Sequence, residues 1–170
     1  MLARNIAKTM TDKKSLNAIK VQKLLFYGQA LSLNILGTVL FDDDIEVWEN
    51  GPVVRDVFRL YRDNSLKYIN SVDKNDTDRH LIIDITLQYF GSKSGTKLIA
   101  LTHQDGGAWK RVVEEKNIKD FVLDNEIIPL PYIEEEMKLF PKIIQELHAP
   151  AKIDKKYLYK NINDIAEKLR

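Results

Sequence analysis

Three histidines, His80, His103 and His148, are the residues of this sequence whose chemistry suits catalysis near neutral pH. No two of them lie three or four residues apart, so the sequence indicates no histidine zinc site, and we expect no metal and no cofactor. His103 lies in the segment Thr-His-Gln-Asp-Gly-Gly-Ala-Trp, where a carboxylate such as Asp105 would let it act as a general base. No nucleophile motif accompanies it. The alternative is that its ring hydrogen-bonds the backbone and fixes this loop.

Two further segments have the residue types of ligand-binding loops but not their spacing. Residues 91–97, Gly-Ser-Lys-Ser-Gly-Thr-Lys, are not a phosphate-binding loop, because Thr96 separates the second glycine from the lysine that must follow it. An EF-hand loop that began at Asp42 would need glycine at position 47, where the chain has Val47. Residues 42–46 therefore predict a solvated acidic turn, which could contact a basic partner.

Composition restricts the class of protein. The chain has 170 residues, 44% of them hydrophobic, which is enough for one continuous core, so we expect a single domain over residues 1–170. Lysine and arginine number 26 and aspartate and glutamate 25, and a net charge of +1 makes a general nucleic-acid-binding protein an unfavoured alternative. The absence of cysteine excludes disulfides and thiolate chemistry. Neither a membrane span nor a signal peptide is indicated, so we expect a cytoplasmic protein.

Hydrophobic residues at helical spacing predict a mainly α fold, a compact multi-helix globular domain with a small β arm or hairpin and a C-terminal helical extension over about 140–170. Residues 2–10 predict a short first helix. A long second helix, with Ser15 as its expected cap, runs to Gly37 and is apolar on more than one side, so we expect it to be central and broadly buried. Gly28 inside this helix implies that another element approaches it closely.

β-branched residues at 39–41 and 45–48 predict the arm or hairpin. The pair Gly51 and Pro52 is expected to open the next helix, because proline suits the first turn of a helix. Residues 121–128 predict a small β turn. The other expected elements are a helix capped by Thr77 or Asp78 and ended by Gly91, a helix over 108–116, one that begins at Pro131, one that begins or kinks at Pro141, and a final one capped by Asp154.

Two blocks of the chain together resemble the Panacea domain, an antitoxin family related to phage-associated Soc-type antitoxins. The first block matches at Lys20, Gln22, Lys23, Leu24, Leu25, Tyr27, Gln29, Leu40, Phe41, Ile45, Trp48, Gly51, Pro52 and Val53. The second block matches at Tyr89, Gly91, Leu98, Thr102, His103 and Trp109. Val21, Phe26 and Gly28 depart from the family pattern as packing changes. The resemblance covers roughly residues 5–139 and leaves the last thirty residues unmatched.

The resemblance implies an antitoxin that neutralises a cognate toxin, encoded next to it, by direct stoichiometric protein–protein binding. Family members face very different toxins, so the class of toxin stays open. Some relatives act as adaptors that deliver the toxin to a Clp-type protease, which is the alternative function. An enzyme that depends on His103 is a further alternative, and the family pattern establishes no catalytic residue.

The candidate partner-binding residues combine aromatic anchors with charges. They are Lys20, Lys23, Tyr27, Asp43, Asp44, Glu46, Trp48, His103 and Trp109. The residues expected to have a structural role in the motif are Gln22, Gly51, Pro52, Val53 and Thr102. The lysines of the first two helices are expected on their solvent-exposed faces. For Trp48, Trp109 and Tyr27, the alternative is that they belong to the core.

Overall fold

The structure is a computed structural model, and it describes residues 1–121 and 126–148. These residues form eight α-helices, two 3₁₀ turns and one antiparallel hairpin, which confirms the predicted mainly helical fold with a small hairpin. The elements in chain order are α1 (Ala3–Lys13), α2 (Ala18–Leu36), β1 (Glu46–Trp48), β2 (Gly51–Val53), α3 (Arg55–Arg62), η1 (Leu66–Tyr68), α4 (Thr77–Phe90), α5 (Gly95–Thr102), α6 (Ala108–Glu115), α7 (Leu130–Glu135), η2 (Glu136–Leu139) and α8 (Pro141–His148). No helix among the described residues is long and apolar enough to cross a membrane.

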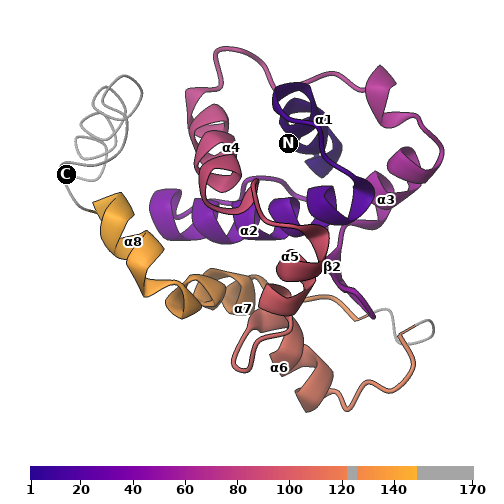
Figure 1. The fold of residues 1–170 in the computed structure, drawn as a ribbon, viewed down its shortest axis with the longest axis vertical. Coiled ribbons are helices and arrows are strands. Elements are labelled where there is room, and N and C mark those ends of the chain that lie inside the picture. The colour runs from indigo at the N-terminus through magenta and orange to yellow at the C-terminus, as the bar shows by residue number, and fades with distance from the viewer. Residues whose placement is uncertain (122–125, 149–170) are drawn as a thin grey trace.

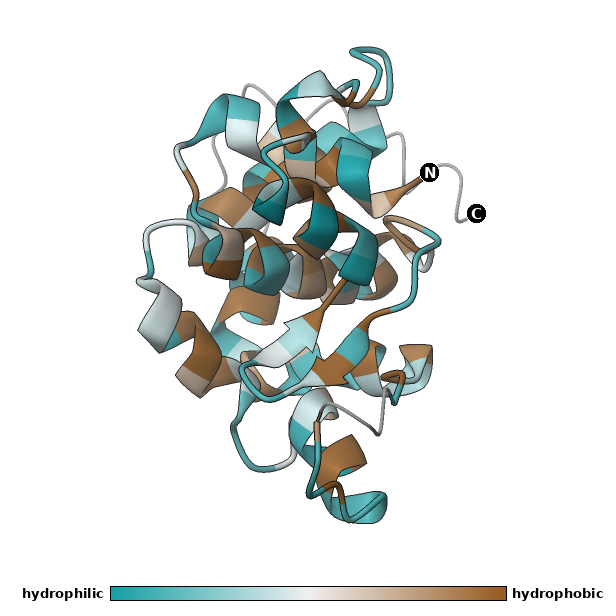
Figure 2. Cartoon of the chain, turned by 90° about the vertical axis from the view of Figure 1, so that its right-hand side faces the viewer, coloured by the Kyte–Doolittle hydropathy of each residue, from teal (hydrophilic) through white to brown (hydrophobic). Residues whose placement is uncertain are grey.

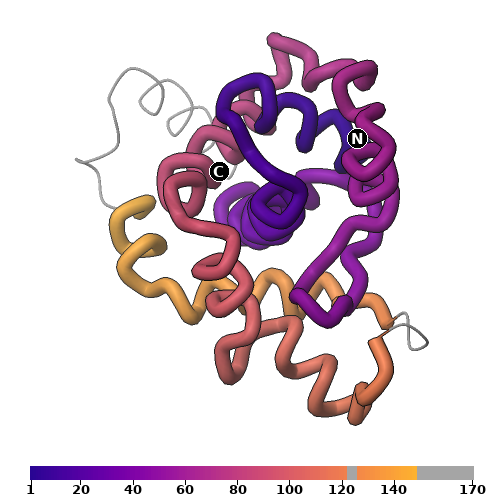
Figure 3. The backbone as a smooth tube through the Cα atoms, turned by 45° about the vertical axis from the view of Figure 1, so that its right-hand side comes forward, coloured from indigo at the N-terminus to yellow at the C-terminus, as the bar shows by residue number. Residues whose placement is uncertain are grey.

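The fold is organised around α2, which crosses the middle of the molecule (Figure 1). Helices α1, α3, α4, α5 and α7 and strand β2 all contact it. Figure 3 shows α2 nearly end-on, with the rest of the chain wound around it. Every residue from 21 to 32 is buried, so the helix has no solvent-exposed face along these residues. This confirms the expectation of a broadly buried central helix, which its apolar residues on several sides had predicted.

The two ends of α2 differ in how well the sequence placed them. Gly37 ends the helix as predicted, with a φ of +66° in the left-handed region that glycine adopts without strain. The predicted cap Ser15 is wrong, because the side chain of Asn17 accepts the hydrogen bond from the backbone N–H of Lys20 at 2.9 Å. The chain enters α2 late because Leu16 is buried and its carbonyl accepts a hydrogen bond from the Tyr61 hydroxyl.

Gly28 lies where three elements converge on α2. A Cβ atom at this position would be 3.0 Å from Leu40 Cδ2 of the arm and 3.4 Å from Thr86 Oγ1 of α4. It would also be 3.6 Å from Met10 Cε of α1. The predicted close approach is therefore present, and it explains a residue that otherwise weakens a helix interior.

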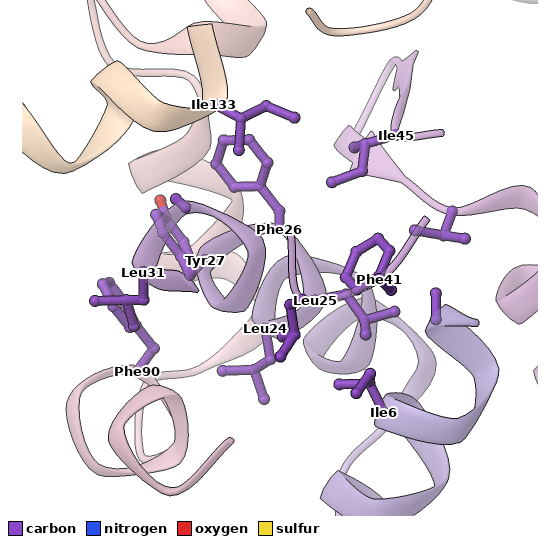
Figure 4. Close-up of a cluster of buried hydrophobic side chains, with 14 of the residues drawn as sticks. Ile6, Leu24, Leu25, Phe26, Tyr27, Leu31, Phe41, Ile45, Phe90 and Ile133 are labelled. Carbon is purple, nitrogen blue, oxygen red and sulfur yellow. The ribbon is translucent and has the colours of Figure 1, made fainter. Parts of the chain in front are cut away.

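The core surrounds α2, and Figure 4 shows side chains from α1, α2, the arm, α4 and α7 meeting there. The Tyr27 ring stacks on Phe90 with ring centroids 4.2 Å apart, and Phe140 meets both rings edge-on. Hydrophobic residues gather along the central helix and inside the molecule, while the outer turns are largely hydrophilic (Figure 2). Tyr27 thus belongs to the core, which was the alternative interpretation of this residue.

The arm that follows α2 is held by one side chain of that helix. Gln29 is buried, and its Oε1 accepts hydrogen bonds from the backbone N–H groups of Leu40 and Phe41 at 2.9 and 3.2 Å. Its Nε2 donates to the Phe41 carbonyl at 3.1 Å. A single amide therefore satisfies three main-chain groups that burial would otherwise leave without partners.

The helix expected to open at Gly51 and Pro52 begins later, at Arg55. Both residues lie instead in strand β2, with Pro52 opposite Val47. Proline is tolerated there because the short edge strand does not need its missing N–H. Likewise, the side chain of Asp76 caps α4, accepting from the backbone of Arg79 at 3.2 Å, one residue before the predicted caps Thr77 and Asp78.

The later elements agree with the sequence, apart from one segment. Gly91 follows α4, α6 occupies the predicted range, and Pro141 begins the new helix α8. Residues 126–128 pair with β1, since Val47 N–H donates to the Glu126 carbonyl and Ile128 N–H donates to the Ile45 carbonyl, both at 2.8 Å. The centre of the predicted β turn and the final helix capped by Asp154 lie outside the described residues.

Candidate functional site

The candidate site is built around the hairpin of β1 and β2, which is three residues long on each side. Glu46 pairs with Val53, Val47 with Pro52, and Trp48 with Gly51. In Figure 1 the hairpin lies below one end of α2 and beside α5, with α6 lower in the view. An isolated two-stranded hairpin is marginally stable in water, so neighbouring elements must fix it.

Side chains of α2 bond the main chain of the second strand. Gln22 Oε1 accepts from the N–H of Val54 at 2.8 Å, and Gln22 Nε2 donates to the Val54 carbonyl at 3.2 Å. Lys23 Nζ donates to the Pro52 carbonyl at 3.0 Å. Gln22 thus forms a two-point clamp on Val54, the residue that precedes α3.

Replacing Gln22 with leucine is expected to lower the free energy of unfolding by about 2 kcal/mol, because two buried main-chain groups of Val54 lose their partners. Urea denaturation followed by circular dichroism measures this loss. The matched control is Gln88→Leu on the exposed face of α4, which should change stability by less than about 0.5 kcal/mol. Equal losses in the two variants would contradict the clamp.

The turn of the hairpin is held from the other side by α5 and α6. Trp109 Nε1 donates to the Trp48 carbonyl at 2.9 Å. The His103 ring lies 3.8 Å from the Trp109 ring, with Nδ1 2.7 Å from the Ile99 carbonyl and Nε2 3.1 Å from the Glu49 carbonyl. Both ring nitrogens of His103 therefore lie within hydrogen-bond distance of main-chain carbonyls. This geometry agrees with a backbone-fixing histidine.

The outer face of the hairpin carries an ion pair and two aromatic rings. Arg55 donates to Glu46 through Nε at 2.9 Å and through Nη2 at 2.6 Å, and Trp48 Nε1 donates to the same carboxylate at 2.8 Å. The hydrogen bonds to Glu46 are the larger cause, and the negative charge of Glu46 the smaller one, of a raised pKa of Arg55. The Trp48 ring lies 4.9 Å from Phe58 and 5.4 Å from the Arg55 guanidinium. These contacts hold Trp48 in one orientation.

A pocket of about 280 Å³ opens between the hairpin, α2 and α3. The residues that form its base and walls include Ile19, Lys23, Trp48, Val53, Phe58 and Phe121. Lys23 is 2% exposed, and burial lowers the pKa of its amine from 10.5 to about 7. The expectation that Lys23 lies on a solvent-exposed helix face is therefore wrong, because this face of α2 is covered by the hairpin.

Other predicted residues lie away from the pocket. Lys20 donates to the Gly91 carbonyl at 2.8 Å. Asp43 accepts from the backbone N–H of Ala3 at 2.7 Å, and Asp42 pairs with the N-terminal amine, so the acidic turn stabilises the start of α1. Asp44 is exposed in the same turn.

The structure thus brings together Lys23, Glu46, Trp48, His103 and Trp109, with the motif residues Gln22, Gly51, Pro52, Val53 and Thr102 beneath or within the hairpin. Phe58, Phe121 and Arg55 complete the site and were not among the predicted residues. Glu46 and Trp48 are two residues apart and therefore lie on the same face of a strand. An acidic and an aromatic side chain on one face are a signal that could have pointed to a cation such as Arg55 beside them. Among the described residues, no three histidine, aspartate or glutamate side chains gather to hold a metal ion.

Comparison with known proteins gives two findings. The model of the family described as "Antitoxin SocA-like, Panacea domain" matches residues 21–110, a range that contains most of α2, the hairpin, His103 and Trp109. Antitoxin SocA of Caulobacter vibrioides (strain NA1000 / CB15N) is 29% identical over an alignment of 127 residues, and the match covers 63% of this chain and 68% of that protein. No solved structure matches the chain.

Proposed function

The chain belongs to the SocA-like Panacea domain antitoxin family, and from this premise we propose that it neutralises a cognate toxin by binding it directly and stoichiometrically. The mechanism requires no turnover and no cofactor. Family membership supports a non-enzymatic role, and the contacts of the His103 ring with main-chain carbonyls favour a structural role for this residue.

The observation that carries this proposal is the hairpin surface around Trp48. Tryptophan and arginine dominate the binding energy of protein interfaces. Here the Arg55 guanidinium lies over the Trp48 ring, and Trp48 lines the pocket. Bonds from α2, α5 and α6 hold the hairpin main chain in place. A surface fixed before binding loses little conformational entropy in the complex, which favours tight association.

Trp48→Ala is expected to weaken toxin binding about 30-fold or more, the effect of losing a hot-spot residue worth at least 2 kcal/mol. The chain and the product of the adjacent reading frame are co-expressed, cell growth is scored, and the affinity of the purified complex is measured by titration calorimetry. Tyr68→Ala is the matched control, because Tyr68 is an aromatic residue 77% exposed on η1, outside the site. Thermal unfolding of both variants checks that they remain folded.

Full neutralisation by a folded Trp48→Ala variant would place the toxin surface elsewhere. Charge reversal at Lys23 is unsuited to this test, because the side chain is buried and the variant would fold poorly. The amount of toxin in the rescued cells separates the two family mechanisms. Direct neutralisation keeps the toxin in the complex, whereas an adaptor for a Clp-type protease would deplete it.

A further inference from the structure

We propose that the pocket at the hairpin binds a carboxylate carried on a flat apolar body, with the carboxylate at Lys23 and the body against Trp48, Phe58 and Phe121. The volume of about 280 Å³ is near the lower end of the range for small-molecule sites, roughly 300–1,000 Å³. The site would therefore take one ring and its acidic group. This inference concerns the chain alone and does not require the toxin.

The first support is the bonding state of the Lys23 amine. An ammonium group has three N–H donors, and the described residues supply one acceptor, the Pro52 carbonyl. Burial is the one cause of its lowered pKa, and no carboxylate charge among residues 1–121 and 126–148 opposes it. A buried cation without an anion is costly, which is why burial lowers the pKa of this amine. A carboxylate ligand would supply both the missing charge and a second acceptor.

The second support is the character of the pocket walls. Trp48, Phe58 and Phe121 present aromatic surface, and Ile19 and Val53 add aliphatic surface. Aromatic rings favour a planar guest through stacked or edge contacts. The apolar walls thus favour a planar apolar group on the ligand, while Lys23 favours a negatively charged one.

The number of charges in the pocket distinguishes a carboxylate from a phosphate. Lys23 is the one cationic side chain among the residues that line it, and the Gln22 amide is already bonded to Val54. A phosphate dianion needs more donors than one amine provides. Glu49 and Asn50 are exposed at the mouth, where water screens the Glu49 charge more effectively than it screens a charge at the buried base.

The test uses phenylacetate and its uncharged analogue phenylacetamide as probes, titrated into the full chain at pH 6 and pH 9 by calorimetry. At pH 6 phenylacetate is expected to bind at least 10-fold more tightly than phenylacetamide, because the amine is then protonated. The preference should fall several-fold at pH 9. Lys23→Met should abolish the preference. Ala18→Phe, which adds a ring at another residue that lines the pocket, should weaken both probes. Lys14→Met, an exposed lysine outside the pocket, is the matched control and should bind like the parent chain.

Equal affinity for the two probes, a preference that survives Lys23→Met, or no binding of either probe at millimolar concentration would overturn the inference. A second titration in the presence of toxin identifies the source of the carboxylate. Loss of phenylacetate binding means that the toxin supplies an acidic group beside an aromatic or apolar one, and retained binding means a free organic acid. The first titration contains no toxin, so its result tests the pocket even if the chain does not bind the proposed toxin.

Discussion

The free energy of unfolding is expected to pass through a minimum near pH 7, because two buried groups change charge in the folded protein close to that pH. Burial raises the pKa of Glu136 from 4.5 to about 7 and lowers the pKa of Lys23 from 10.5 to about 7. Burial disfavours the charged form of each group. Glu136 is charged above its pKa, whereas Lys23 is charged below its pKa. Their effects on stability therefore have opposite slopes.

Glu136 controls the acid side of the profile. Its side chain is 1% exposed, Oε2 accepts from the N–H of Ala108 at 2.7 Å, and Oε1 and the nearby Tyr27 hydroxyl have no hydrogen-bond partner among the described residues. The folded pKa is the higher one, so the stability from Glu136 is complete below pH 4.5 and is lost as the pH rises through 7. The full loss corresponds to roughly 3 kcal/mol.

Lys23 controls the alkaline side. Its folded pKa is the lower one, so its contribution is complete above pH 10.5 and is lost as the pH falls through 7. The difference between the two pKa values corresponds to roughly 5 kcal/mol. Stability should therefore rise by up to about 1.4 kcal/mol per pH unit above pH 7.

Urea denaturation at half-unit intervals from pH 5 to 9.5 measures the profile, and two substitutions assign its limbs. Glu136→Gln keeps an oxygen for Ala108 and should flatten the acid limb alone. Lys23→Met should flatten the alkaline limb alone and raise stability at pH 7, because a buried charge is replaced by an apolar chain of similar length. A profile that stays unchanged in both variants would show that neither group carries the effect.

Gly51→Ala is expected to lower the free energy of unfolding by about 2–5 kcal/mol. Gly51 has a φ of +95°, which costs an L-residue about 1–2 kcal/mol. Its added Cβ would also lie 2.6 Å from Thr102 Oγ1 and 3.1 Å from Lys23 Nζ. Thr102 is fully buried and its hydroxyl donates to the Ile99 carbonyl at 2.9 Å, so it cannot turn away freely. Such overpacking adds about 1–3 kcal/mol.

Gly37→Ala is the matched control, because Gly37 also has a positive φ but a Cβ there would meet nothing within 4 Å. Its loss should be about 1–2 kcal/mol, from the backbone alone. In a chain that already carries Thr102→Ala, the further change Gly51→Ala should cost less stability than it does in the parent chain, because the Thr102 hydroxyl is no longer in the way. Identical losses at the two glycines would mean that the hairpin does not press against α5 as described.

The elements were largely predictable because their signals are local. The apolar pattern of α2, the glycine that ends it and the prolines of the later helices each act within a few residues. The helix starts that were misplaced are positions where two nearby residues have similar capping preferences. Ser15 and Asn17 are both good caps, and burial of Leu16 decided between them.

The site was predictable in its residue types but not in its burial. Trp48, His103 and Trp109 were named from the sequence, and the structure brings them together. Lys23 and Glu136 look solvated in the sequence because charged residues usually are. Their burial depends on the hairpin covering one face of α2 and on α6 meeting η2, and these packings join residues far apart in the chain. Glu136 does lie at helical spacing from the hydrophobic residues Ile133 and Phe140, which weakly indicates a buried position. The adjacent Glu134 and Glu135 make this signal hard to recognise in the sequence.

The bonds that fix the arm and hairpin have one consequence for variation. Gln29, Gln22, Lys23, His103 and Trp109 all bond main-chain atoms of residues 40–54 and none of their side chains. A bond to a carbonyl is indifferent to the side chain on that residue. The outward-facing positions of the segment can therefore diversify while its path stays the same. The fold thus offers a rigid main-chain frame on which outward-facing side chains can vary.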